Sequence, residues 1–383
     1  MESGVVIVGA GQGGFQVAAS LRAGGYPGPI TLIGDEPHLP YQRPPLSKEY
    51  LLGKQAIEKT ELRPRAFYEA QNIALMTGER VVEIDRGNQR VRLASGASIA
   101  YSNLVLATGA RVRTLPIDGA RYLRCRDDAI QLKREIDNCR SVVIVGGGFI
   151  GLEVAAAARA LGKKVTVVEM QPRLMARVVA PVISEFYREL HVEQGVEIRF
   201  GAQAIPAADL MVAGVGVIPN DELARDAGLT TANGIAVDAY LRTSDPNIYA
   251  IGDCAEHDNP YAGDRVRLES VQNAVDQAKC AAANIIASTR QPYDAVPWFW
   301  THQFDVMLQM AGLSAASDQV VMRGDSGSRK FSVFYFKDGK LRAADSINRP
   351  TDHMLARKLL AAKAPVTPAQ AGDERLDLKS LLT

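Results

Sequence analysis

Residues 5–14 read VVIVGAGQGG, and residues 142–151 read VVIVGGGFIG. In both stretches a short apolar run suited to a buried strand leads into a G-x-G-x-x-G turn, and a helical pattern follows. Each helix is followed by another apolar run, at residues 30–33 and 165–168. The sequence therefore repeats a strand–turn–helix–strand unit, which predicts an α/β chain with two Rossmann-like dinucleotide-binding domains.

The glycines of these turns have a physical role in holding a dinucleotide. A pyrophosphate binds backbone N–H groups at the positive end of a helix, and a side chain at the contact point would hold it away. The matching glycines are Gly9, Gly11 and Gly14 in the first turn and Gly146, Gly148 and Gly151, with Ile150 between them, in the second. One such motif is also compatible with a plain turn between a strand and a helix, but two complete units favour nucleotide sites.

An acidic residue follows the second strand of each unit, where a carboxylate can accept hydrogen bonds from ribose hydroxyls. In the first unit this is Asp35 or Glu36, and in the second it is Glu169. Glu169 would repel a 2′-phosphate, so the second site is expected to prefer NADH to NADPH. Arg173 and Arg177 weaken this argument, because a phosphate-binding site would supply an arginine; the alternative is a solvated basic loop.

Composition limits the classes of function. The 383 residues include 44 Lys and Arg against 43 Asp and Glu, a formal charge of +1 that gives no general attraction for nucleic acid or anionic lipid. Residues 142–161 are apolar, but three consecutive glycines and Glu153 interrupt them, so we expect no membrane span. The four cysteines show no metal-ligand spacing, and no metal is expected. With no secretory leader in the sequence, we expect a cytoplasmic protein.

The remainder of the chain adds further elements. Short strands are predicted at residues 90–93, 103–107, 235–237 and 248–251, and an amphipathic helix is predicted from Val271. From Trp298 onward the character changes, with strands at 332–336 and 341–345 around a turn. That pattern predicts a separate C-terminal α+β domain.

Several longer motifs give the chain a resemblance to a known family. They are YQRPPLSK at 41–48, ATG at 107–109, GVIPN at 216–220, TSDPNIYAIGD at 243–253 and PWFW at 297–300. With these, nearly the whole chain resembles the ferredoxin reductases of bacterial oxygenase systems, within the FAD-dependent pyridine-nucleotide reductase superfamily. The resemblance implies an FAD-binding domain at 1–113 and 242–297, an NADH-binding domain at 114–241 and a C-terminal domain at 298–383.

The resemblance also assigns site residues. It implies FAD contacts from Gly9, Gly11, Gly14, Asp35, Glu36, Lys48, Val82, Thr108, Gly109, Arg124, Gly252, Asp253, Val271 and Trp300. It implies NADH contacts from Gly146, Gly148, Ile150, Gly151, Glu169, Arg177 and Gly216.

Three residues are implied to shape the environment in which the flavin reacts. Lys48 would lie near the flavin ring, paired with Glu153, where a cation favours the reduced ring; the alternative is an ordinary helix lysine. The helix that starts at Val271 would direct its positive end at the flavin. Trp300 would lie near the flavin where the electron acceptor docks, or else serve only as a packing residue.

The chain departs from the family pattern in one place. The family continues past the position of Gln203 through a β-hairpin with an Asp-Gly turn before the position of Pro206, and this sequence has no such hairpin. Either the loop has been lost, or a disordered stretch is missing from the sequence. The difference falls in the NADH-binding domain and leaves its glycine motif intact.

The reaction follows from where the cysteines are. Related disulfide reductases carry a Cys-x4-Cys pair after the first acid, but this chain has no cysteine before Cys125. A thiol relay is thus excluded, and the resemblance implies an FAD-dependent ferredoxin–NAD+ reductase. Electrons would pass from NADH through FAD, one at a time, to a [2Fe–2S] ferredoxin that supplies a cytochrome P450 or a Rieske ring-hydroxylating oxygenase.

Other members of the superfamily share most of these motifs. A rubredoxin reductase or an NADH oxidase is the alternative enzyme. A non-enzymatic flavoprotein like apoptosis-inducing factor, which binds NADH and nucleic acid, is the alternative of another class; the formal charge of +1 argues against it.

Overall fold

The computed structural model describes residues 3–201, 204–315 and 317–382. They form two compact units, each with a hydrophobic core of its own. The first unit comprises Met1–Gln42, Thr60–Arg111 and Ile218–Ala295, and the second comprises Arg43–Lys59, Val112–Val217 and Val296–Thr383. The first unit includes residues 218–241, which the expected boundaries assign to the NADH-binding domain; the three-domain division stays a prediction.

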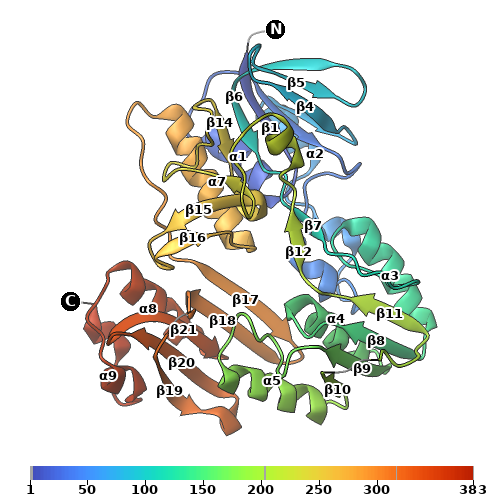
Figure 1. Ribbon diagram of the computed structural model, residues 1–383, viewed down its shortest axis with the longest axis vertical. Helices are drawn as coiled ribbons and strands as arrows, with labels where there is room; N and C mark the ends of the chain where they lie inside the picture. The colour runs from blue at the N-terminus through green and yellow to red at the C-terminus, as the bar shows by residue number, and fades with distance from the viewer. Residues whose placement is uncertain (1–2, 202–203, 316, 383) are drawn as a thin grey trace. The chain divides into compact units, whose positions relative to one another are not determined.

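The first unit is built on a sheet in the order β3-β2-β1-β6-β5-β4, with β14 also paired to β6. Strands β1, β4, β5, β6 and β14 of this sheet are labelled in Figure 1. Pairs among β1, β2, β3, β6 and β14 are parallel, whereas β4, β5 and β6 pair antiparallel. The strands are β1 (Gly4–Val8), β2 (Ile30–Gly34), β3 (Ile73–Thr77), β4 (Val81–Asp85), β5 (Arg90–Leu93), β6 (Ser98–Leu106) and β14 (Ile248–Ala250).

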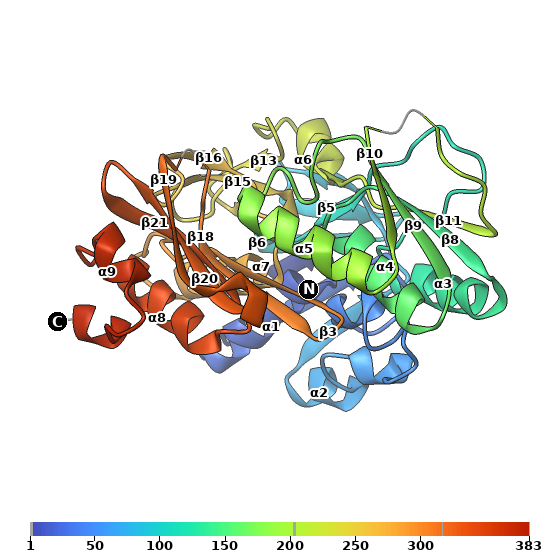
Figure 2. The same cartoon turned by 90° about the horizontal axis from the view of Figure 1, so that it is seen from below.

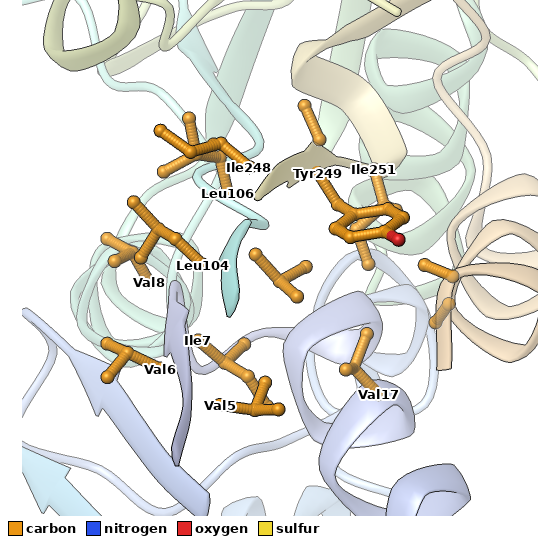
Figure 3. Packing of buried hydrophobic residues seen from close by; sticks show 14 of the residues in the cluster. Val5, Val6, Ile7, Val8, Val17, Leu104, Leu106, Ile248, Tyr249 and Ile251 are labelled. Carbon is orange, nitrogen blue, oxygen red and sulfur yellow. The ribbon is translucent and has the colours of Figure 1, made fainter. Parts of the chain in front are cut away.

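Strand β1 lies in the middle of this sheet and is buried throughout. Figure 3 shows Val5 and Ile7 on the side of β1 that faces the helix carrying Val17, and Val6 and Val8 on the opposite side. A central parallel strand is covered on both faces, so it reads as a continuous apolar run. This is why residues 5–8 carry no polar side chain.

Helices and a small sheet complete the first unit. The helix α1 packs along α7, and α7 begins at Val271 as predicted. A small sheet has the order β13-β15-β16. The bounds are α1 (Gln12–Ala23), α2 (Arg65–Ala70), α6 (Glu222–Asp226), α7 (Val271–Ile286), β13 (Ile235–Ala236), β15 (Ala255–Asn259) and β16 (Asp264–Val266).

The second unit begins with a four-stranded parallel sheet in the order β10-β9-β8-β11. Helix α4 follows the second glycine turn and is buried along most of its length, as expected for an alanine-rich crossover helix. The elements are α3 (Arg126–Asn138), β8 (Ser141–Val145), α4 (Phe149–Ala160), β9 (Lys164–Glu169), α5 (Pro181–Glu193), β10 (Glu197–Phe200) and β11 (Leu210–Ala213).

The same unit contains an antiparallel sheet in the order β17-β18-β21-β20-β19, with α8 and α9 beside it (Figure 2). The predicted hairpin is confirmed: Asp338 and Gly339 take positive φ at its tip. The elements are β17 (Trp298–Gln303), β18 (Val306–Gly312), β19 (Gln319–Asp325), β20 (Lys330–Lys337), β21 (Lys340–Ile347), α8 (Pro350–Ala361) and α9 (Pro368–Gly372).

One continuous hydrophobic core joins the two sheets of the second unit. Phe186 of α5 packs edge-on against Phe331 of β20, with ring centroids 5.2 Å apart. Phe149 of α4 packs against Phe299 of β17 at 4.7 Å. The C-terminal sheet therefore shares its core with the second glycine-turn sheet.

Two short strands, β7 (Ala110–Val112) and β12 (Val217–Pro219), pair with each other where the chain passes between the units. Residues 142–161 fold as β8, the glycine turn and α4, followed by Leu161. In the part of the chain that the structure describes, no helix is both long and apolar enough to cross a bilayer.

Candidate functional site: two glycine turns

The three motif glycines of the first turn have different surroundings. Gly9 has a φ of 110°, and a Cβ there would lie 2.1 Å from the carbonyl oxygen of Ala107. A Cβ on Gly14 would lie 1.9 Å from the carbonyl oxygen of Gly9. A Cβ on Gly11, in contrast, would have no heavy atom within 4 Å beyond its chain neighbours. Gly9 and Gly14 thus close the turn, and Gly11 leaves open space at the start of α1.

A cavity of about 670 Å³ lies at the carboxyl ends of β1 and β2, within the size range of small-ligand sites. It brings together, from the predicted FAD set, Gly9, Asp35, Val82 and Thr108. Val82 is 42% exposed and lies where the pairing of β4 with β5 shifts register. The other lining residues are Val8, Ile33, Glu79, Arg80, Val81, Arg111, Asn220, Glu222, Leu223 and Asp226.

The structure distinguishes the two candidate acids after β2. Asp35 lines the cavity, where its carboxylate lies 3.0 Å from Nη2 of Arg80. Glu36 instead accepts a hydrogen bond of 2.5 Å from the hydroxyl of Tyr41. Asp35 is therefore the better candidate to accept hydrogen bonds from a ribose. Arg80 did not stand out in the sequence, because an exposed arginine carries no pattern that distinguishes it.

The ATG segment of the first unit is fixed by hydrogen bonds to Asn220. Oγ1 of Thr108 donates to the carbonyl oxygen of Asn220 at 2.6 Å, and Nδ2 of Asn220 donates to the carbonyl oxygen of Thr108 at 2.9 Å. The backbone nitrogen of Asn220 also donates to Gly109 at 2.9 Å. These bonds hold the wall of the cavity that the two segments form.

The remaining predicted FAD residues of this unit lie at a turn beside α1 and α7. Gly252 has a φ of 74°, and its backbone nitrogen donates to Oε1 of Gln277 on α7 at 2.7 Å. Nη1 of Arg267 donates to the carbonyl oxygen of Asp253 at 2.9 Å. Val271 is the first residue of α7, whose N-cap Ser270 accepts from the backbone of Asn273. The Gly252 turn is thereby tied to the helix whose N-terminus the sequence singled out.

The second glycine turn repeats the division of roles found in the first. Gly146 has a φ of 107°, and a Cβ there would lie 2.5 Å from the carbonyl oxygen of Gly214. A Cβ on Gly151 would lie 2.1 Å from the carbonyl oxygen of Gly146. A Cβ on Gly148 would meet nothing closer than 3.9 Å. The middle glycine again leaves space at the start of a helix, here α4.

Glu169 ends β9 beside this turn, and both of its carboxylate oxygens are held by backbone. Oε2 accepts from the nitrogen of Gly147 and Oε1 from the nitrogen of Gln171, each at 2.7 Å. Ile150, on the first turn of α4, is 46% exposed. The negative charge is thus fixed at the mouth of the glycine turn, as a ribose-binding acid requires.

The two arginines after Glu169 differ in their bonding. Arg173 donates to the carbonyl oxygens of Ala176 and Val179 at 2.6 and 2.7 Å, so it fixes its own loop. Arg177 is exposed, and its guanidinium makes no hydrogen bond or ion pair with another described residue. Its Nη2 would lie 3.5 Å from a Cβ on Gly216, which has a φ of 100°. Of these two arginines, Arg177 is therefore the one whose guanidinium can bind a ligand.

Lys48, Glu153 and Trp300 all belong to the second unit. Nζ of Lys48 lies 2.7 Å from Oε2 of Glu153, so the predicted pairing is present. Trp300, on β17, lies beside Trp298 with ring centroids 5.6 Å apart. Arg124 precedes α3, and its backbone nitrogen donates to Asp128 at 2.9 Å.

The cysteines fit no redox relay. All four are free, and Cys254 is fully buried, with burial raising the pKa of its thiol. A buried thiol with a raised pKa is a poor nucleophile. Among the described residues, no group of three or more His, Cys, Asp and Glu side chains is arranged to hold a metal ion.

These features define a chain with two separate dinucleotide sites and no thiol relay, the class of FAD- and NAD-linked oxidoreductases. The chain belongs to the pyridine nucleotide-disulphide oxidoreductase family, whose model matches residues 3–206 and 205–278. A second family model, the reductase C-terminal domain, matches residues 298–382. The first match is divided at residues 205–206, just after the position of the missing hairpin. Residues 202–203 of that segment lie outside the described residues.

Relatives of known activity match the chain along its length. Rhodocoxin reductase of Rhodococcus erythropolis is 49% identical over 399 residues, covering 98% of this chain and 93% of that protein. The crystal structure of the ferredoxin reductase for the CYP199A2 system of Rhodopseudomonas palustris is 47% identical, with a TM-score of 0.96 and full coverage of both chains. The covalent complex of putidaredoxin reductase with putidaredoxin has a TM-score of 0.96 at 40% identity, covering 100% of this chain and 98% of that one.

Proposed function

We propose that this chain is an FAD-containing, NADH-dependent ferredoxin reductase that supplies electrons to a cytochrome P450 or a ring-hydroxylating oxygenase through a [2Fe–2S] ferredoxin. The observation that carries the proposal is the pair of glycine turns, each closed by its outer glycines and open at the middle one. The similarity to the reductases of oxygenase systems supports ferredoxin as the acceptor.

The first site is proposed to hold FAD. The N–H groups of the first turn of α1 have no side-chain cap, so they can donate to a pyrophosphate over Gly11. Asp35 accepts hydrogen bonds from the ribose of the adenosine half. Val82 and Thr108 shape the cavity around that half. FAD, when bound, supplies the chemistry that converts a two-electron donor into single-electron transfers.

The second site is proposed to hold NADH. The first turn of α4 likewise has no side-chain cap and can donate to a pyrophosphate over Gly148. Glu169 is proposed to accept from the adenosine ribose and to disfavour a 2′-phosphate, and Arg177 and Gly216 are proposed to contact the nucleotide where it extends along the turn. Because these groups orient the nicotinamide nucleotide and do not transfer protons, no general acid–base pair is needed.

From the resemblance, we propose that two sets of residues act on the reacting ring. They are Lys48, Arg124, Glu153 and Trp300 of the second unit, and Asp253 and Val271 of the first. Glu153 holds the Lys48 ammonium at 2.7 Å, so the cation keeps a fixed position. The N-terminus of α7 adds the positive end of a helix dipole. A fixed cation and a positive helix end each favour negative charge on a bound ring, and such charge favours electron acceptance from NADH.

The test uses the purified protein with FAD, and measures NADH oxidation, oxygen consumption and cytochrome c reduction. With an added bacterial [2Fe–2S] ferredoxin of the oxygenase type, cytochrome c reduction is expected to rise and then saturate. If the rate of oxygen consumption equals the rate of NADH oxidation and does not change when ferredoxin is added, the protein is an oxidase. Faster reduction of rubredoxin than of the ferredoxin would show a rubredoxin reductase.

The cytoplasm is the proposed compartment. NADH is generated there, and the four cysteines are free thiols, as a reducing compartment allows. Fractionation of the source cells, with NADH-dependent cytochrome c reduction as the marker, tests this assignment.

A further inference from the structure

The carboxylate of Glu153 is the end of a buried series of hydrogen bonds that begins at His191 on α5 and passes through β17 of the C-terminal sheet. Glu153 is 3% exposed, on α4. Its Oε2 accepts from Oγ of Ser47 at 2.5 Å and from Nζ of Lys48 at 2.7 Å. Its Oε1 accepts from Oγ1 of Thr301, on β17, at 2.6 Å. The group that holds Lys48 is therefore held in turn by Thr301.

The series of hydrogen bonds continues beyond Thr301 through two more side chains. Nε2 of Gln303 lies 3.3 Å from Oγ1 of Thr301, and Oε1 of Gln303 lies 2.8 Å from Nε2 of His191 on α5. A carboxylate only accepts, so the Thr301 hydroxyl donates to Glu153 and accepts from the Gln303 amide. The Gln303 oxygen then accepts from His191, whose Nε2 carries the proton. Every hydrogen bond in the chain thus points toward Glu153.

The side chains of this hydrogen-bond series are buried, so water cannot replace a hydrogen bond that one of them loses. Thr301 and His191 are 0% exposed and Gln303 is 1% exposed. Burial lowers the pKa of His191 to about 4, so its imidazole is neutral and contributes a fixed dipole. Among the described residues, Thr301 supplies the hydrogen bond to Oε1 of Glu153. Without that hydroxyl, a buried carboxylate oxygen would lose its partner, and the carboxylate would turn to find another.

The geometry of β17 explains why the C-terminal sheet supplies this anchor. Side chains alternate along a strand, so Phe299, Thr301 and Gln303 share one face. Phe299 packs against Phe149 of α4 at 4.7 Å, which brings that face onto the helix that carries Glu153. Trp300, on the other face, is the residue proposed to lie on the acceptor side. One strand therefore presents both Trp300 and the anchor of the Lys48–Glu153 pair.

We propose that Thr301, oriented by Gln303 and His191, is a positioning residue that fixes Glu153 and through it the ammonium of Lys48. The inference rests on the proposed function, in which Lys48 lies beside the flavin. Replacing the hydroxyl loosens the Lys48 cation, so the bound flavin should become harder to reduce. The flavin midpoint potential then falls, and the rate constant of flavin reduction by NADH falls about tenfold.

The experiment compares Thr301→Val and Thr301→Ala, which lack the hydroxyl, with Thr301→Ser, which keeps it. The midpoint potential is measured by titration against a reference dye, and flavin reduction is followed by anaerobic stopped-flow absorbance. The valine and alanine variants are expected to shift the potential in the direction of Lys48→Met, while the serine variant stays near the wild type. Loss of folding in both variants, with Thr301→Ser intact, would make the hydroxyl a requirement of the fold and overturn the proposal.

A double-mutant cycle separates this inference from the function on which it rests. If Thr301 acts through Lys48, Thr301→Val should change the potential little in a Lys48→Met background. The positioning role would be overturned if Thr301→Val shifted the potential equally in both backgrounds. It would also be overturned if Lys48→Met shifted the potential and Thr301→Val did not. No shift from Lys48→Met itself would instead contradict the proposed role of Lys48 in the flavin site.

Discussion

Oε2 of Glu169 lies 2.7 Å from the backbone nitrogen of Gly147, so the acid that ends β9 is hydrogen-bonded to the glycine turn that follows β8. The carboxylate therefore has two tasks. It places a negative charge where the adenosine ribose is expected, and it braces the turn that is proposed to receive the pyrophosphate. Substitutions that separate charge from hydrogen bonding distinguish the two.

Glu169→Gln should narrow the preference for NADH over NADPH. The amide oxygen can still accept from Gly147, so the turn keeps this bond although the bond from Gln171 is lost, and the repulsion of a 2′-phosphate is gone. We expect the ratio of kcat/KM for the two nucleotides to fall about tenfold, and Glu169→Arg to narrow it further or invert it. Steady-state kinetics with each nucleotide measure the ratio. An unchanged ratio in both variants would contradict the assignment.

Alanine at the first-turn glycines should separate folding from binding. In Gly14→Ala the new Cβ would lie 1.9 Å from the carbonyl oxygen of Gly9, and overpacking should destabilise the apoprotein by about 2 kcal/mol or more. In Gly11→Ala the Cβ meets open space, so stability should change by less than about 0.5 kcal/mol. FAD affinity should nevertheless fall about tenfold. Urea denaturation of the apoprotein and FAD titration test the pair; full FAD affinity in Gly11→Ala would be the contrary result.

The neighbouring acids after β2 provide another matched pair. Asp35→Asn should weaken FAD binding about tenfold, because Asp35 lines the cavity and its charge strengthens a hydrogen bond to the ribose. Glu36→Gln should leave FAD affinity close to the wild type, since Glu36 is bonded to Tyr41. Fluorescence titration of the apoprotein with FAD measures both. A larger loss in Glu36→Gln than in Asp35→Asn would reverse the assignment.

Asp345 makes stability depend on pH. It is 1% exposed on β21, and burial raises its pKa from 3.8 to about 7, although the hydroxyl of Tyr335 donates to it at 2.5 Å and opposes the shift. Between these values the folded chain binds a proton that the unfolded chain has released, so this contribution to stability is lost as pH rises toward 7. The Tm of Asp345→Asn should equal that of the wild type near pH 4 and exceed it by a few degrees at pH 8.

The control for this prediction is Asp338→Asn, at the exposed tip of the hairpin, where asparagine also accepts a positive φ. Its difference in Tm from the wild type should be the same at both pH values. If Asp345→Asn behaves in the same way as this control, Asp345 does not bind the proton in the folded chain.

The sequence predicted those parts of the molecule that local patterns determine. The two glycine turns, the start of α7 at Val271 and the hairpin at Asp338 and Gly339 each need a residue type at a fixed spacing, and the structure has them there. The pairing of Lys48 with Glu153 came from resemblance and is also present. In each case the determining residues are close in sequence or belong to a motif.

Other features depend on packing between distant segments. Ser47 and Thr301 lie 106 and 148 positions from Glu153, and no local pattern links them. Asp35 and Glu36 could not be distinguished from the sequence, because adjacent residues at a strand end point to different sides. The packing of the C-terminal sheet against α4 and α5 was not predicted either, because it joins segments that are far apart in the sequence.

The shared core limits where the chain can be divided, both in protein engineering and in evolution. Phe186 and Phe331, like Phe149 and Phe299, meet across what sequence comparison treats as a boundary between two families of domain. A chimaera that exchanged only residues 298–382 would place foreign side chains against α4 and α5. Chimaeras should fold stably when residues 112–217 and 296–382 come from one parent. Recombination is therefore expected to exchange these two stretches together.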